Sequence, residues 1–120
     1  MNIRVANADE LNSIAARLHD ARFAPPDIVF DERAGIFSLK CWIFMHRSQW
    51  RECQILFESV IDCEIKVFEK VRYYELATIR FSKQTQNLEL IAHYGIEVKL
   101  TVNGLNGTYS ETGGSREVWP

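Results

Sequence analysis

The sequence predicts a small α+β domain, in which an N-terminal helix packs on a strongly bent, mostly antiparallel sheet or a partly closed barrel of about seven strands. Apolar residues recur at every second position over most of the chain, and this period places them on one face of a pleated strand. An amphipathic helix signal precedes the first strand. The alternating runs are Phe37, Leu39, Cys41, Ile43 and Met45; Ile61, Cys63, Ile65 and Val67; Leu88, Leu90, Ala92 and Tyr94; and Ile96, Val98, Leu100 and Val102.

The first expected element is a helix over residues 8–22. Asn7 is a favourable N-cap, and Glu10 three residues later gives a capping-box pattern. Pro25 and Pro26 end the helix, because proline pushes the preceding residue out of the helical region. One face of this helix should pack on the sheet while the opposite face is exposed to solvent, because the apolar residues form a single stripe: Leu11, Ile14, Ala15, Leu18 and Ala21.

Strands are expected next at residues 27–31 and 36–45, joined by a tight turn at Gly35. Residues 53–57 and 60–68 form either one long bent strand or two, because the alternation slips near Glu58 and Ser59. Strands over residues 74–81, 88–94 and 96–102 follow, and the last two form a hairpin. Short strands with regularly spaced turns are typical of sandwiches and small barrels.

The composition fits one globular domain over residues 1–110, followed by a flexible tail over residues 111–120 with Trp119 as its anchor. The chain has 120 residues, of which 47% are hydrophobic and 25% charged, so one core can hold it. The net charge of −2 provides no basic field for nucleic acid. With no secretory leader and no apolar run of about 20 residues, we expect a cytoplasmic protein that does not enter a membrane.

The three cysteines, Cys41, Cys53 and Cys63, follow the apolar phase of their strands. No two have Cys-x-x-Cys spacing, and we interpret them as small reduced hydrophobic residues, with a redox thiol or a bridge as alternatives.

The order of elements resembles a group of small bacterial proteins of unknown function. The likeness rests on a helix ending at residues 18–21 (Leu-His-Asp-Ala), on strand segments 27–30 and 37–39, on segments 57–60 and 76–81, and on the closing strand pair over residues 88–102. It implies the architecture described above and carries no activity or cofactor.

The candidate polar site is His19 with Asp20, at the expected end of the helix. A histidine oriented by a carboxylate in a cleft suits acid–base chemistry, whereas capping of the helix end is the structural alternative. His19, His46 and His93 are far apart in sequence, so ligands for a metal cannot be assembled from local spacing. We therefore expect no metal, no cofactor and no catalytic residues.

The candidate interaction surface is a loop and the strand before it: Trp42, Phe44, Arg47, Trp50 and Arg51. Tryptophan and arginine are enriched where proteins bind one another. Trp50 packing inward is the alternative for the loop. For Trp42 and Phe44 the alternatives are core, an interface and the lining of a ligand pocket.

The function predicted from these observations is a non-enzymatic protein-interaction or self-associating module with a protein partner or a second copy of itself. A carrier with an apolar pocket in the sheet is the alternative, although a small ligand is less favoured. An enzyme that uses His19 and Asp20 is the second alternative.

Overall fold

The computed structural model describes residues 2–46 and 49–116. Over these residues the chain forms one α-helix and a ten-stranded antiparallel sheet, which confirms the α+β class. The elements in order are β1 (Asn2–Val5), α1 (Ala8–Arg17), β2 (Arg22–Phe23), the 3-10 turn η1 (Pro25–Asp27), β3 (Ile28–Asp31), β4 (Ile36–Phe44), β5 (Trp50–Phe57), β6 (Val60–Val67), β7 (Tyr74–Ser82), β8 (Asn87–Ala92), β9 (Ile96–Val102) and β10 (Gly107–Arg116).

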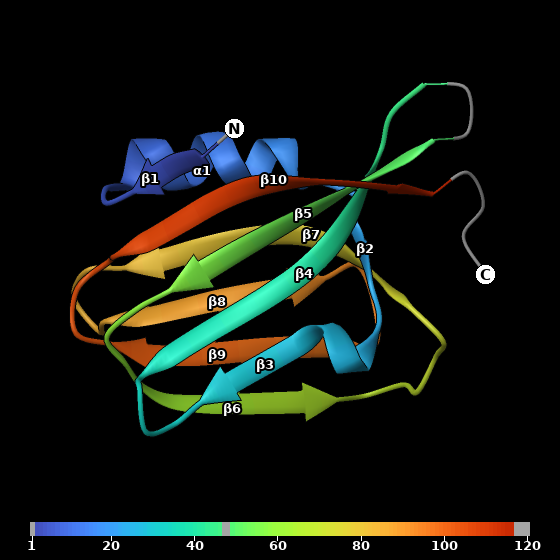
Figure 1. The fold of residues 1–120 in the computed structure, drawn as a ribbon. Helices are drawn as coiled ribbons and strands as arrows, with labels where there is room; N and C mark the ends of the chain where they lie inside the picture. The colour runs from blue at the N-terminus through green and yellow to red at the C-terminus, as the bar shows by residue number, and fades with distance from the viewer. Residues whose placement is uncertain (1, 47–48, 117–120) are drawn as a thin grey trace.

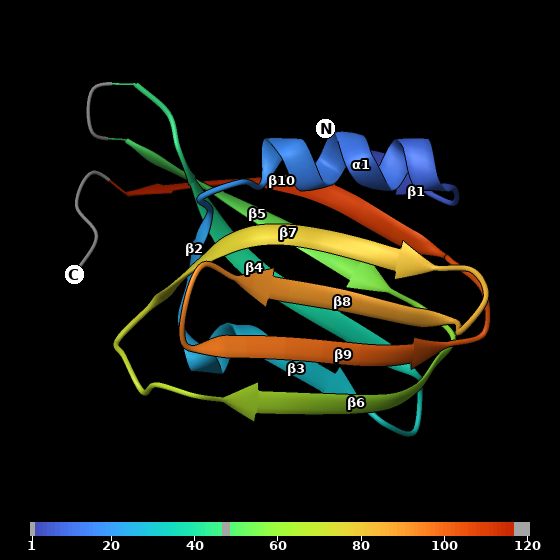
Figure 2. The same ribbon diagram turned by 180° about the vertical axis from the view of Figure 1, so that it is seen from behind.

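The sheet folds over on itself into two layers. Its strand order is β1-β10-β5-β4-β2-β7-β8-β9-β6, and β3 pairs with β4 beside this path. The layer of β10, β5, β4 and β3 is in front in Figure 1, and the layer of β7, β8, β9 and β6 is in front in Figure 2. The two-residue strand β2 joins the layers, because Arg22 pairs with Trp42 of β4 and with Glu75 of β7.

Two details of the predicted architecture are wrong. The sheet has ten strands within the described residues rather than about seven, and it is not a closed barrel, because β1 and β6 are the two ends of the strand order. β1 and β2 are too short to show alternation. β10 extends to Arg116, and Glu111, Ser115 and Arg116 pair with β5 where a flexible tail was expected. Trp119 lies outside the described residues.

The helix is shorter than predicted and ends at Arg17 rather than at residue 22. Its N-terminus forms as expected, since Asn7 Oδ1 accepts a hydrogen bond from Glu10 N at 2.9 Å. Figures 1 and 2 show α1 across the opening between β10 and β7, and Leu11, Ile14 and Leu18 are buried there. Within the described residues, no helix is long and apolar enough to cross a membrane.

The segment from residue 53 to residue 68 is two strands, not one bent strand. Ser59 adopts a left-handed conformation with φ 58°, and the chain crosses there from β5 in one layer to β6 in the other. The predicted hairpin of β8 and β9 forms, with Gly95 at φ 82° in its turn.

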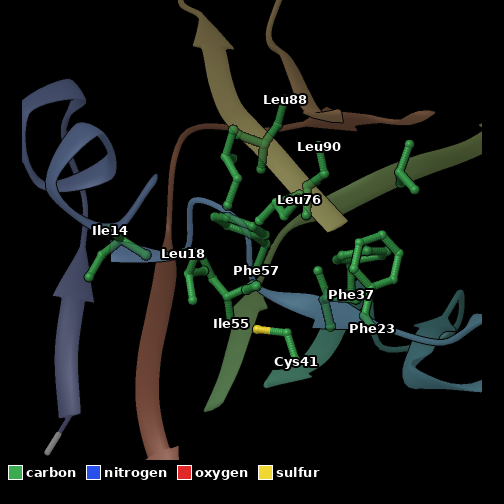
Figure 3. Packing of buried hydrophobic residues seen from close by; sticks show 14 of the residues in the cluster. Ile14, Leu18, Phe23, Phe37, Cys41, Ile55, Phe57, Leu76, Leu88 and Leu90 are labelled. Atoms are coloured by element: carbon green, nitrogen blue, oxygen red, sulfur yellow. The ribbon is translucent and has the colours of Figure 1, made fainter. Parts of the chain in front are cut away.

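The core fills the space between the layers. Figure 3 shows side chains from α1, β4, β5, β7 and β8 converging there. Phe37, Phe57, Tyr74 and Tyr109 are its largest buried side chains, each at most 1% exposed. An interior packed with aromatic rings does not support the hypothesis of a carrier with a pocket inside the sheet.

The contact between Gly107 and Phe57 gives a test of this packing. The two residues are opposite each other on β10 and β5, and a Cβ on Gly107 would lie 2.8 Å from Phe57 Cδ1. We expect Gly107→Ala to lower the free energy of unfolding by roughly 1–3 kcal/mol, measured by urea denaturation, because the ring has to move. The cost should shrink in a Phe57→Leu background, and an equal cost in both backgrounds would contradict the contact.

Candidate functional site

The predicted pair His19 and Asp20 lies where the end of α1 meets β7. The chain leaves the helix after Leu18, and Asp20 takes a left-handed conformation with φ 68°. Asp20 N then donates to Leu76 O at 2.8 Å, and Leu76 N donates to Ala21 O at the same distance. Two hydrogen bonds thus fix this segment along one side of β7.

His93 lies on the other side of β7. It directly follows β8, and its amide donates to Glu75 O at 2.9 Å. Glu75 and Leu76 of β7 therefore lie between the backbone of His93 and that of Asp20. The fold brings together two histidines that are 74 positions apart in the sequence.

The three side chains converge on one carboxylate oxygen. Asp20 Oδ1 lies 2.6 Å from His93 Nε2 and 3.5 Å from His19 Nε2. His19 Nδ1 lies 2.9 Å from Ala77 O, and since a carbonyl only accepts, this nitrogen carries the proton and donates it. The imidazole rings meet edge to face, with centroids 5.1 Å apart.

The cluster is open to water. The side chains of His19, Asp20 and His93 are 53%, 62% and 38% exposed. A surface cavity of about 590 Å³ adjoins His19 and Asp20 and is lined on its other side by Ile43, Phe44 and Met45. A small molecule or ion can therefore reach the three groups directly.

Sequence reasoning identified two of these residues and missed the third. His19 and His93 are far apart in sequence, and only the fold brings them together. The proximity of His93 to this pair could not be predicted from local spacing in the sequence. It depends on the register of β8 against β7 and on how the end of the helix docks on β7.

The predicted interaction surface is only partly assembled. Phe44 and Trp50 are opposite each other on β4 and β5, with ring centroids 5.2 Å apart, and Phe44 is 59% exposed. Trp42 is buried at 8% exposure. It lies on the same outer face, because it alternates with the core residues Cys41 and Ile43.

An arginine that the sequence analysis did not single out sits among these aromatic rings. The Arg22 guanidinium lies 4.6 Å from the centroid of the Trp50 ring and 4.4 Å from that of Tyr73. Such cation–π contacts fix the rings in place. Arg47 lies outside the described residues.

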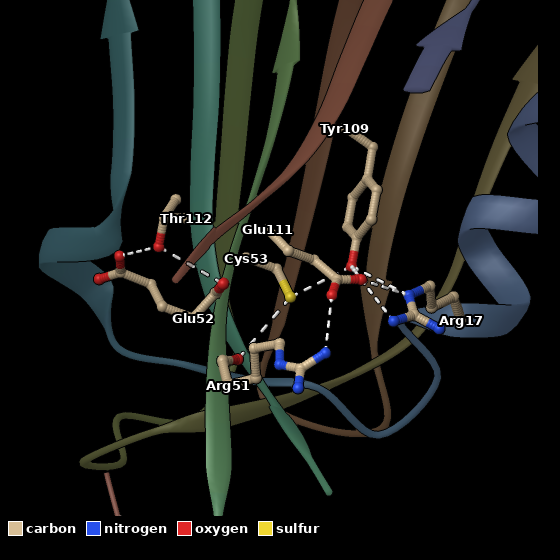
Figure 4. A network of polar contacts seen from close by, with 7 residues as sticks. All are labelled: Arg17, Arg51, Glu52, Cys53, Tyr109, Glu111 and Thr112. Carbon is tan, nitrogen blue, oxygen red and sulfur yellow. Dashed lines mark hydrogen bonds and ion pairs between the residues drawn. The ribbon is translucent and has the colours of Figure 1, made fainter. Parts of the chain in front are cut away.

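Arg51 belongs to a different cluster, which Figure 4 shows. Its guanidinium donates to Glu111 Oε1 at 3.0 Å, and Arg17 of α1 donates to Glu111 Oε2 from both Nε and Nη2. The Tyr109 hydroxyl accepts from Arg17 Nε and has Glu111 Oε2 and Cys53 Sγ as acceptors at 3.1 Å. This network ties the helix to β5 and β10.

Glu111 is charged despite its burial. Its side chain is 8% exposed, and burial alone would raise its pKa, but hydrogen bonds from Arg17, Arg51 and Tyr109 outweigh it. The pKa of Glu111 is therefore lowered from its ordinary value of 4.5. Burial raises the pKa of Tyr109, so its hydroxyl stays protonated.

The three thiols are free. Burial raises the pKa of all three: strongly for Cys41, and also for Cys53 and Cys63. A raised pKa disfavours the reactive thiolate, which agrees with the interpretation of these cysteines as small hydrophobic residues.

Comparisons with protein-family models, with curated proteins and with solved structures found no match to this chain. The candidate sites therefore rest on their geometry.

We expect Glu111→Gln to lower the free energy of unfolding at neutral pH by about 1–3 kcal/mol, because charge-assisted hydrogen bonds are lost. A folded-state pKa below the unfolded value contributes stability above about pH 4.5, and this stability is lost as the pH falls through the lowered pKa. The difference between wild type and variant should therefore shrink in acid. Urea denaturation across pH tests this.

Glu58→Gln is the matched control, because Glu58 is exposed and accepts a single side-chain hydrogen bond, from Asn106 Nδ2. If both variants had equally small effects at neutral pH, the network would not stabilise the fold.

The cysteines should differ in reactivity in the native protein. Cys63 is half-buried near the end of the sheet, whereas Cys41 and Cys53 are fully buried. We expect a thiol reagent to label Cys63 first, and the other two only when the protein opens or unfolds. Mass spectrometry of the labelled peptides measures the order, and faster labelling of Cys41 would contradict it.

Proposed function

We propose that the protein is a non-enzymatic, cytoplasmic interaction module that associates with a second copy of itself through the edge of β6. The observation that carries this proposal is an eight-residue edge strand with apolar side chains left in water. Ile61, Ile65 and Val67 of β6 are 65%, 45% and 49% exposed, and Phe68 directly after it is 68% exposed.

The backbone of β6 supports this reading. β6 pairs with β9 along one side and is the last strand in the order, so no strand among the described residues pairs with its other side. Figures 1 and 2 both show β6 at the rim of its layer, far from α1. Free N–H and C=O groups along an edge form a template for another strand.

The side chains along β6 have two distinct faces. Ile65 and Val67 lie opposite Val98 and Ile96 of β9, which are buried in the core. The inward face of β6 is therefore apolar but uncovered. Its outward face carries Glu64 and Lys66, and burying the inward face against a second copy would remove apolar surface from water.

The charges on β6 favour one register of a two-fold dimer. If Ile65 lies opposite Ile65 of the second copy in antiparallel pairing, Glu64 of each copy faces Lys66 of the other. Cys63 then faces Val67 across the joint, so apolar side chains meet on the inward face. Placing Glu64 opposite itself would instead put like charges on the two-fold axis, which is unfavourable.

A charge-swap experiment tests both the dimer and its register. We expect the wild-type chain to dimerise in analytical ultracentrifugation. Glu64→Lys and Lys66→Glu should each weaken the dimer by about tenfold or more, because each puts two like-charge pairs across the joint. Mixing the two variants should restore association as a heterodimer, since opposite charges then face each other again.

The control is Arg80→Glu, which reverses one charge of the exposed pair with Glu89 on β7 and β8, away from the edge. This variant should dimerise like the wild type. Circular dichroism checks that every variant is folded. A wild-type chain that stays monomeric at its highest soluble concentration would contradict the proposal, and so would a mixture that does not associate.

A further inference from the structure

We infer that His19 Nε2, His93 Nε2 and Asp20 Oδ1 bind one divalent transition-metal ion, with Zn²⁺ as the representative ion, at the joint between α1 and β7. The site is independent of the β6 edge and of the proposed self-association. It is distinct from the acid–base role considered for His19 and Asp20, because it requires His93 as a ligand.

The donor set fits such an ion. Two imidazole nitrogens and one carboxylate oxygen suit zinc and its first-row neighbours, whereas Mg²⁺ and Ca²⁺ prefer oxygen ligands alone. The three candidate ligand atoms all lie within 4.8 Å of one another. Three protein ligands leave a fourth position open, and the exposure of all three side chains lets water reach it.

The distances require only small movements. Zinc–ligand bonds of about 2.0–2.2 Å in a tetrahedral site place neighbouring ligand atoms roughly 3.4 Å apart. His19 Nε2 and Asp20 Oδ1 already have this separation at 3.5 Å. His93 Nε2 and Asp20 Oδ1, at 2.6 Å, share a proton, and an ion that replaces this proton would open the pair by about 0.8 Å.

His19 is oriented as a metal ligand. Its Nδ1 donates to Ala77 O at 2.9 Å, so its Nε2 is the nitrogen left for a metal and is turned toward Asp20. Metal-ligating histidines commonly use their other nitrogen in this way, and the hydrogen bond fixes both the tautomer and the ring direction. Capping of the helix end accounts for a histidine near Leu18 but not for the convergence of His93 on the same carboxylate oxygen.

The backbone holds Asp20 and His93 in place before any ion arrives. Asp20 and His93 each donate an amide hydrogen bond to β7, to Leu76 O and Glu75 O. Ligands fixed on opposite sides of one strand lose little conformational freedom when they bind, which favours affinity.

The test is titration of the untagged full chain, stripped with a chelator, with Zn²⁺ by isothermal titration calorimetry. We expect one ion per chain. His19→Ala, His93→Ala and Asp20→Asn should each weaken binding at least tenfold; asparagine tolerates the left-handed backbone at this position. His46→Ala is the matched control, because His46 is exposed and outside the cluster, and it should bind like the wild type.

Side-chain ¹⁵N NMR gives a second readout, in which Zn²⁺ should shift the Nε2 signals of His19 and His93 but not those of His46. Circular dichroism checks that each variant is folded. Binding of Zn²⁺ by a His19→Ala/His93→Ala double variant as tight as by the wild type would overturn the inference. A wild type that binds no ion, or a His46→Ala variant that alone loses binding, would overturn it as well.

Discussion

The two residues of β2 are the constraint on which the rest of the structure depends, because through them the two layers become one sheet. Arg22 pairs with β4 and β7, and Phe23 pairs with Tyr74 of β7. The chain has to leave the helix by residue 18 to reach this position, which explains why α1 ends before the apolar stripe does. On the side of the sheet away from β2, no strand among the described residues pairs with both layers, and β6 is left there as a free edge.

The period of two identified the strands that line the core, because burial of one face requires it. The β8–β9 hairpin and the inward residues of β4 follow from alternation alone. The number of strands did not follow, since β1 and β2 have four and two residues and cannot show a period. β10 was not predicted at all, because Gly107, Gly113 and Gly114 resemble turns when the pairing with β5 is unknown.

The polar sites show the same division between local and long-range information. His19 and Asp20 are adjacent, so their proximity could be predicted, whereas His93 joins them only through the pairing of β8 with β7. Arg51 was grouped with Trp50 because they are neighbours in sequence. Successive residues of a strand point to opposite faces, so Arg51 turns instead toward Glu111.

The end of the helix is fastened to both layers, and this matters for any ligand at His19 and Asp20. Arg17 binds Glu111 and Tyr109 of β10 in one layer, while Asp20 and His19 bind the backbone of β7 in the other. A buried carboxylate costs desolvation free energy unless its partners satisfy it, and here three donors do so. Since Arg17 and His19 are two residues apart, the network that stabilises Glu111 also limits the motion of the histidine. The ordering needed to form the three-ligand cluster is therefore largely complete in the folded chain.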